Sequence, residues 1–208
     1  MCSIHSSVYP TQKVFRVLVE AMSHPGRVYR MPKPQKIDPW ETSLLAVAYT
    51  LLDHEVSFAF IGQKIETAGQ IYAATKARQV AVEEADYLIV EGNRSDGQIF
   101  SAKCGVSAYP EQGATIIYVI DQEDQNGNNT ERNEILLKGP GIKDQMSPQL
   151  AGLSVEEFKH IRDLNAEYPL GVDCIFLDGD NQVMCIPRST KITFRNGVME
   201  YWSDGVME

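Results

Sequence analysis

Three arginines in this 208-residue chain, Arg16, Arg27 and Arg188, are the first candidates for chemistry. The planar guanidinium group binds phosphate and phosphonate oxygens through two parallel hydrogen bonds. Arg27 directly follows the turn His24-Pro25-Gly26, and His24 could act there as a general acid or as a donor to a phosphate. The alternatives are that the arginines pair with acidic residues of the second half and that His24 is simply solvated.

Three further residues extend this candidate anion site. Gly139 and Gly141 flank Pro140, and the two glycines would allow backbone N–H groups to turn towards one anion, although Gly-Pro-Gly is also an ordinary turn. Asp173 lies in an apolar stretch, and a buried carboxylate is costly unless it is paired. We expect Arg188 to be its partner, either in a structural ion pair or in a site. No residue is assigned as catalytic.

Charge and composition exclude several classes of protein. The net charge of −9 comes from the second half, because residues 1–104 hold 11 basic and 11 acidic side chains. A sequence pI near 5.0 argues against a general nucleic-acid binder. No apolar stretch approaches the roughly 20 residues of a membrane span, and no signal peptide is recognisable. Four scattered cysteines and the absence of a metal-binding motif favour a reduced, cytoplasmic protein without metal.

The elements that must position these residues follow from hydrophobic periodicity. Thr11 is expected to cap the first helix, and Ser154 with Glu157 forms a capping box for the last one. On the first helix the expected apolar face consists of Val14, Phe15, Leu18, Val19 and Met22. The predicted helices span residues 11–22, 41–52, 65–76 and 154–166, and the predicted strands span 56–61, 80–82, 87–91, 115–120, 134–138, 172–177 and 183–186.

Strands alternate with helices in the first half, whereas hairpins dominate the second. Residues 115–120 and 134–138 are expected to form one hairpin across the polar segment 121–133, and residues 172–177 and 183–186 another, which 191–194 could extend. This pattern predicts an α/β fold in which a mixed sheet carries helices on both faces, as a three-layer α-β-α domain. We expect a single domain over residues 1–208, with residues 195–208 as a tail.

The second hairpin makes a specific prediction about two cysteines. If Gly179 and Asp180 form a two-residue loop, Cys174 and Cys185 stand directly opposite each other. In a reducing compartment they would be packed thiols. A three-residue loop would offset the pair by one position.

Five blocks of the sequence resemble, in the same order, the H subunit family of the bacterial carbon–phosphorus lyase system (PhnH). The first is Phe15-Arg16-x-Leu18-x-x-Ala21-Met22-Ser23-x-Pro25-Gly26. The other four are Pro110-Glu111-x-Gly113-Ala114-Thr115, Gly139-x-Gly141-Ile142, Pro169-Leu170-Gly171-Val172-Asp173 and Ile186-Pro187-Arg188-Ser189-Thr190. The resemblance spans about residues 10–194.

The resemblance implies a function in the use of organophosphonates. Members of the family assemble with the G, I and J subunits and, with the L subunit, support the formation of ribose 1-phosphonate 5-triphosphate from MgATP and a phosphonate. It also implies a homodimer and a fold like the large domain of pyridoxal-phosphate-dependent transferases, without that cofactor. The iron–sulfur chemistry that breaks the C–P bond belongs to the J subunit.

Three hypotheses follow from these observations. The first is an accessory, non-radical subunit of the carbon–phosphorus lyase machinery, a scaffold that lends arginines to a phosphorylated ligand. The second is a stand-alone enzyme acting on a phosphorylated small molecule, with His24, Arg27 and Arg188 as its site. The third is a protein that still binds pyridoxal phosphate, which a visible Schiff-base absorbance would reveal.

Overall fold

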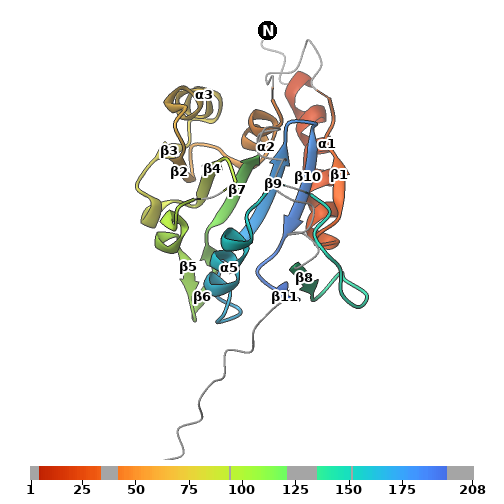
Figure 1. Cartoon of the computed structure of the whole chain (residues 1–208). Helices are drawn as coiled ribbons and strands as arrows, with labels where there is room; N and C mark the ends of the chain where they lie inside the picture. Colours follow the sequence, from red (N-terminus) through yellow and green to blue (C-terminus); the bar gives the residue numbers. More distant parts are fainter. Residues whose placement is uncertain (1–4, 34–41, 94, 121–134, 151, 196–208) are drawn as a thin grey trace, which may run out of the picture.

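The computed structural model describes residues 5–33, 42–93, 95–120, 135–150 and 152–195 (Figure 1). Its α-helices are α1 (His5–Ser23), α2 (Ser43–Leu51), α3 (Ile65–Thr75) and α5 (Val155–Leu164), and two 3₁₀ turns are η1 (Val82–Glu84) and η2 (Gln98–Ser101). The strands are β1 (Val28–Arg30), β2 (Ser57–Ile61), β3 (Arg78–Gln79), β4 (Tyr87–Glu91), β5 (Cys104–Val106), β6 (Tyr109–Gly113), β7 (Thr115–Ile120), β8 (Ile135–Lys138), β9 (Asp173–Asp178), β10 (Gln182–Ile186) and β11 (Lys191–Phe194).

Seven of these strands form one mixed sheet in the order β1-β10-β9-β7-β4-β2-β3. Only β10 runs against the other six, because it is antiparallel to both β1 and β9 while the remaining pairs are parallel. Two short antiparallel ribbons, β8–β11 and β5–β6, lie outside the sheet. The prediction of an α/β protein with a mixed sheet is confirmed.

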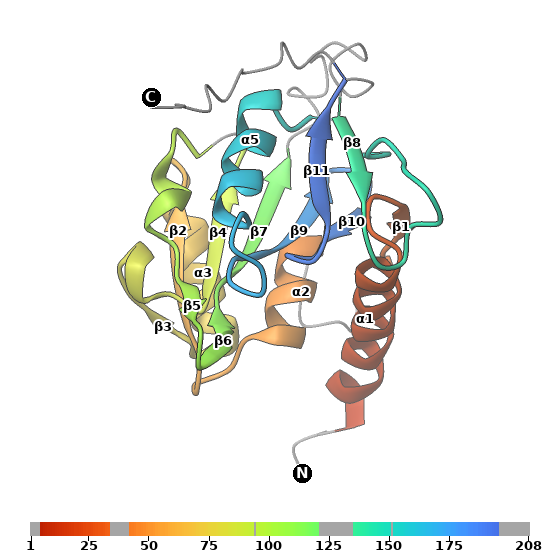
Figure 2. The same ribbon diagram turned by 90° about the horizontal axis from the view of Figure 1, so that it is seen from below.

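Helices cover both faces of the sheet (Figure 1 and Figure 2). Helices α1, α2 and α3 pack on one face, where Phe58, Ile117 and Ile175 point from the strands into their cluster. Helix α5 and the β8–β11 ribbon pack on the other face, against Tyr118 and Phe176. Strand β7 contributes buried side chains to both clusters, as expected of a central strand in a sheet covered on both sides. No helix in the described part of the chain is long and apolar enough to cross a membrane.

Helix α1 differs from its prediction at its start and on its exposed side. It begins at His5 and contains Pro10, so Thr11 is not its cap. Val14 and Leu18 are buried as expected, but Phe15 and Val19 remain 51% and 46% exposed. One residue step rotates a side chain by about 100° around a helix, so these two side chains lie outside the stripe that faces the sheet.

The predicted hairpin between residues 115–120 and 134–138 is wrong. Strand β7 is already paired on both edges, with β4 and β9, so no edge is left for β8. Strand β8 pairs instead with β11, and β11 therefore does not extend the β9–β10 hairpin, whose outer edge is taken by β1. Residues 121–133 lie outside the described residues.

The short strand expected at residues 80–82 is also wrong. The strand next to β2 is Arg78–Gln79, and residues 82–84 form the turn η1. The Val80 N–H donates to the Phe58 carbonyl oxygen at 2.9 Å, next to the β2–β3 pairing, and both Val80 and Val82 pack against the core beside the sheet.

The proposed opposition of Cys174 and Cys185 fails by one position. Cys185 pairs with Ile175 and Cys174 with Ile186, because the turn holds three residues and its last, Asn181, has φ of 58°. Neighbouring positions of a strand point to opposite faces, so Cys174 lies in the α5 cluster and Cys185 in the cluster of α1 to α3. Burial raises the pKa of both thiols.

These positions predict two inert thiols that do not form a disulfide with each other. In the folded protein, a thiol-specific alkylating reagent should leave Cys174 and Cys185 unlabelled, because both are buried and protonated. Mass spectrometry of peptides labelled before and after denaturation measures this. A Cys174–Cys185 disulfide after mild oxidation of the folded protein would contradict the register.

Candidate functional site

Arg188 and Asp173 form the ion pair that the sequence predicts. Arg188 Nε and Nη2 donate to Asp173 Oδ2 at 3.1 and 2.7 Å, and the Arg188 backbone N–H donates to Asp173 Oδ1 at 2.8 Å. The guanidinium group also donates to the carbonyl oxygens of Pro110 at 2.6 Å and Gly113 at 3.4 Å. With side chains only 14% and 27% exposed, this pair connects three separate segments at the start of β9.

Gly139 and Gly141 serve close packing in the structure. A Cβ atom on Gly139 would lie 2.9 Å from the carbonyl oxygen of Ser189, and one on Gly141 would collide with that of Ser23. Their φ angles of 153° and 80° also favour glycine. These contacts join the 139–142 turn to the residue after Arg188 and to the end of α1. A role in anion binding stays a prediction.

Arg16, His24 and Arg27 have no described contact with Arg188. Arg16 and Arg27 are exposed, and His24 Nδ1 lies 3.4 Å from the Glu20 carboxylate one helical turn away. The shallow cleft beside Arg188 is lined by Asp173 and by residues of the 110–111, 168–169 and 187–189 segments, without these three residues. The structure thus brings together Asp173, Arg188 and the turn at Gly139, and a single site of all seven residues stays a prediction.

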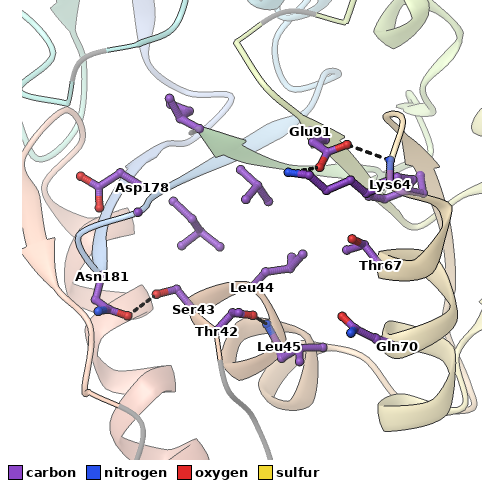
Figure 3. A pocket seen from close by; sticks show the side chains of 15 residues that line it. Thr42, Ser43, Leu44, Leu45, Lys64, Thr67, Gln70, Glu91, Asp178 and Asn181 are labelled. Atoms are coloured by element: carbon purple, nitrogen blue, oxygen red, sulfur yellow. Dashed lines mark hydrogen bonds and ion pairs between the residues drawn. The ribbon is translucent and has the colours of Figure 1, made fainter. Parts of the chain in front are cut away.

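A different pocket lies at the end of the strands opposite to the Arg188–Asp173 pair, beyond the carboxyl ends of the parallel strands (Figure 3). It has a volume of about 380 Å³. Its walls come from the start of α2, the first turns of α3, the ends of β4, β7 and β9, and the β9–β10 turn. None of the seven candidate residues from the sequence lines it.

The chain connections explain why a pocket forms here. From β2 the chain passes through α3 to β3 on one side, and β4 then lies on the other side of β2. In open α/β sheets, ligands bind where consecutive connections leave in opposite directions, outside the carboxyl ends of the strands. A signal in the sequence could have found this pocket, because polar residues follow three strands: Gln63-Lys64, Glu91 and Asp178.

Glu91, the last residue of β4, points its carboxylate at the segment just before α3. Its Oε2 accepts the backbone N–H groups of Gln63 and Lys64 at 3.0 and 3.1 Å, and its Oε1 lies 2.9 Å from Lys64 Nζ. Gly62 makes room for the carboxylate, because a Cβ there would lie 2.7 Å from Oε2. Burial alone would raise the pKa of Glu91, but the hydrogen bonds from Lys64 and Gln63 and the charge of Lys64 outweigh it, so this pKa is lowered.

The opposite wall of the pocket is fixed by the β9–β10 turn. Asp178 Oδ1 accepts the backbone N–H groups of Asp180 and Gln182 at 2.9 and 2.8 Å, and its Oδ2 accepts from Gln182 Nε2 at 2.9 Å. Ser43 Oγ donates to Asn181 Oδ1 at 2.8 Å, which ties the start of α2 to this turn. The pocket wall is therefore held by side chains whose hydrogen bonds fix their rotamers.

A buried ionisable cluster that the sequence does not reveal lies under α5. Ser154 Oγ accepts the Glu157 N–H at 3.2 Å, as the capping box predicts, but the Glu157 carboxylate points into the core. It accepts from Tyr118 Oη at 2.7 Å and from the Ser95 N–H at 3.1 Å, and it lies 3.4 Å from His160 Nδ1. Burial and the Glu157 charge raise the pKa of Tyr118 well above its ordinary value. The cluster anchors α5 on the sheet.

The described ranges place no three His, Cys, Asp or Glu side chains where they could hold a metal ion. The fold and the pocket define an α/β protein with a seven-stranded mixed sheet and a ligand-sized pocket at its carboxyl edge. Within this class, the chain belongs to the family described as bacterial phosphonate metabolism protein (PhnH), which it matches over residues 3–193.

Two curated relatives agree with this membership. A putative C-P lyase subunit protein, HtxG, from Stutzerimonas stutzeri is 30% identical over 186 residues, covering 88% of this chain and 86% of the relative. The alpha-D-ribose 1-methylphosphonate 5-triphosphate synthase subunit PhnH from Rhizobium meliloti (strain 1021) is 25% identical over 190 residues, covering 89% and 91%.

The Arg188–Asp173 pair leads to a prediction about stability. Arg188→Met leaves the partly buried Asp173 carboxylate and two carbonyl oxygens without their donor, so the free energy of unfolding should fall by about 3 kcal/mol. Urea denaturation followed by circular dichroism measures the loss. The matched control is Arg162→Met, which removes an exposed pair with Asp163 and a cation–π contact with Phe194 and should cost at most about 1 kcal/mol. Equal losses in the two variants would contradict the structural role of Arg188.

The lowered pKa of Glu91 leads to a prediction about the pH dependence of stability. Because its pKa is lowered in the folded protein, Glu91 stabilises the fold above the pKa of an unfolded glutamate, about 4.3, and this contribution is lost as the pH falls through the folded pKa. The stability difference between wild type and Glu91→Gln should therefore be largest at neutral pH and shrink on acidification below about 4.3. Urea titrations at several pH values measure it. A difference that grows towards acid would contradict the lowered pKa.

Proposed function

We propose that this chain is a subunit of a carbon–phosphorus lyase system and supports the formation of ribose 1-phosphonate 5-triphosphate from MgATP and a phosphonate. The observation that carries the proposal is the match to the phosphonate metabolism family over residues 3–193, which is nearly the whole chain. A relative that is aligned over 89% of this chain is named a subunit of the corresponding methylphosphonate triphosphate synthase.

Within that system we assign the chain a structural rather than a radical-catalytic part. The donors of Arg188 are directed at Asp173 and at two backbone carbonyls, as expected of a residue that holds the fold together. Helix α1 exposes the apolar side chains of Phe15 and Val19, which suits a protein that works in contact with other chains. The expected partners are the G, I, J and L subunits and a second copy of the chain, in the cytoplasm, where MgATP is available.

We also propose that the fold is related to the large domain of pyridoxal-phosphate-dependent transferases and that this chain has lost the cofactor. What supports it is the seven-stranded sheet with one antiparallel strand, β10, next to its edge. The pocket at the carboxyl ends of the strands of that sheet is the position at which binding of such a cofactor would be tested. Absorbance in the visible Schiff-base band after addition of pyridoxal phosphate would contradict the loss of the cofactor.

Growth on a phosphonate tests the subunit role. A bacterium that lacks its own H subunit should regain growth on methylphosphonate as sole phosphorus source when it expresses this chain, and the purified chain should co-elute with the G and I subunits. Arg162→Met, an exposed substitution, serves as the control that should behave as wild type. Absence of both growth and co-elution would refute the proposal. Turnover of a phosphorylated small molecule by the isolated chain would favour a stand-alone enzyme instead.

A further inference from the structure

The pocket at the carboxyl edge of the sheet has its anion-binding position already filled by the chain itself. The first N–H groups of a helix that follows a parallel strand commonly bind a phosphate. Here the N–H groups of Gln63 and Lys64, the two residues just before α3, both donate to Glu91 Oε2. The helix N–H groups of Ile65 and Thr67 donate to the carbonyl oxygens of Gln63 and Lys64 at 3.0 and 2.9 Å. Figure 3 shows the contact between Glu91 and Lys64. The missing side chain at Gly62 leaves the space that this carboxylate uses. A phosphate or phosphonate would have to displace a bound carboxylate at this position.

Among the described residues that line the pocket, the net charge is negative. Glu91 and Asp178 contribute two carboxylates, and Lys64 contributes one ammonium group. The oxygens of Asp178 accept from uncharged N–H donors, so no described cation neutralises that carboxylate within the pocket. Lys64 Nζ pairs with Glu91 Oε1, but the Lys64 side chain is 62% exposed, whereas that of Glu91 is 16% exposed. The exposed ammonium group of Lys64 can therefore exchange with a ligand ammonium group that reaches the same carboxylate oxygen.

The rest of the lining is apolar and uncharged polar. Leu44, Phe60 and Leu177 contribute apolar surface, and Thr67 and Gln70 project from α3 towards the cavity (Figure 3). A volume of about 380 Å³ suits a small organic molecule. The lining therefore matches a ligand that has an apolar body and a positively charged head group.

We propose that this pocket binds a small organic ammonium compound, whose amino group takes the place of Lys64 Nζ on Glu91 Oε1 while its apolar body lies against Leu44, Phe60 and Leu177. The pocket is accordingly not the place where the chain meets a phosphonate. This assignment rests on the pocket itself and holds whether or not the subunit role is correct.

Three probes that share one apolar body test the proposal with the full chain. They are 2-phenylethylamine, 2-phenylethanol and 2-phenylethylphosphonate, and isothermal titration calorimetry with ligand-observed NMR measures their binding. The amine should bind about tenfold more tightly than the alcohol, because it gains one charge-assisted contact, and the phosphonate should not bind. Failure of the amine to bind, or tighter binding of the phosphonate, would overturn the proposal.

Two substitutions locate the contact and separate it from an anion site. Glu91→Gln keeps an acceptor for the N–H groups of Gln63 and Lys64 but removes the charge, so it should weaken amine binding about tenfold. Lys64→Met removes the competing ammonium, so amine binding should stay equal or become tighter. If the pocket were an anion site, Glu91→Gln would gain phosphonate binding, and neither Glu91→Gln nor Lys64→Met would bind the amine.

Glu156→Gln is the matched control, because Glu156 is an exposed carboxylate on α5, the helix on the face opposite α3, where it pairs with Lys159. This variant should bind the amine like wild type. Amine binding that survives Glu91→Gln unchanged, or that is lost equally in Glu156→Gln, would also overturn the assignment. Circular dichroism spectra of the three variants confirm that each is folded.

Discussion

The ion pair between Arg188 and Asp173 is the interaction on which this end of the fold depends. Arg188 follows β10, Asp173 begins β9, and the same guanidinium group reaches Pro110 and Gly113 on β6. Carbonyl oxygens inside a protein need donors, and an arginine can supply several at fixed angles. The neighbouring turn at Gly139 packs against Ser189, and Gly141 packs against the end of α1. Segments that are distant in the sequence are thus held together around one side chain.

This arrangement gives a physical reason for the sequence blocks that mark the family. The blocks around residues 110–115, 169–173 and 186–190 meet through hydrogen bonds of Arg188, and the block at 139–142 meets the last of them through Gly139. The block that ends at Gly26 joins through Gly141 and through the hydrogen bond from the Gly26 N–H to the Cys185 carbonyl at 3.1 Å. The residues of these blocks therefore pack together around Arg188, whereas the pocket lies at the opposite end of the strands.

Elements that depend on a local sequence pattern could be predicted from the sequence. Strands β4, β7, β9 and β10 were predictable because apolar side chains occupy both faces of each, and Ser154 was recognisable as a cap. Pairing of distant strands was not predictable: the partner of β8 depends on which strand edges are already occupied, and the cysteine register depends on one extra turn residue, Asn181. Polar residues at the ends of three strands hinted at the pocket, but the sequence does not show that Ser43, Glu91 and Asn181 line one cavity, because the elements that carry them come together only when the sheet forms.

Arg188 donates to Asp173 and to two backbone carbonyls, and we propose that it serves the fold and does not contact the phosphonate ligand. The most direct measurement is a structure of the chain in an assembled carbon–phosphorus lyase complex with a phosphonate-containing ligand bound. We expect Arg188 to remain on Asp173 and the Pro110 carbonyl, without contact to the ligand. A guanidinium group turned away from Asp173 and bound to the ligand's phosphonate oxygens would contradict this account.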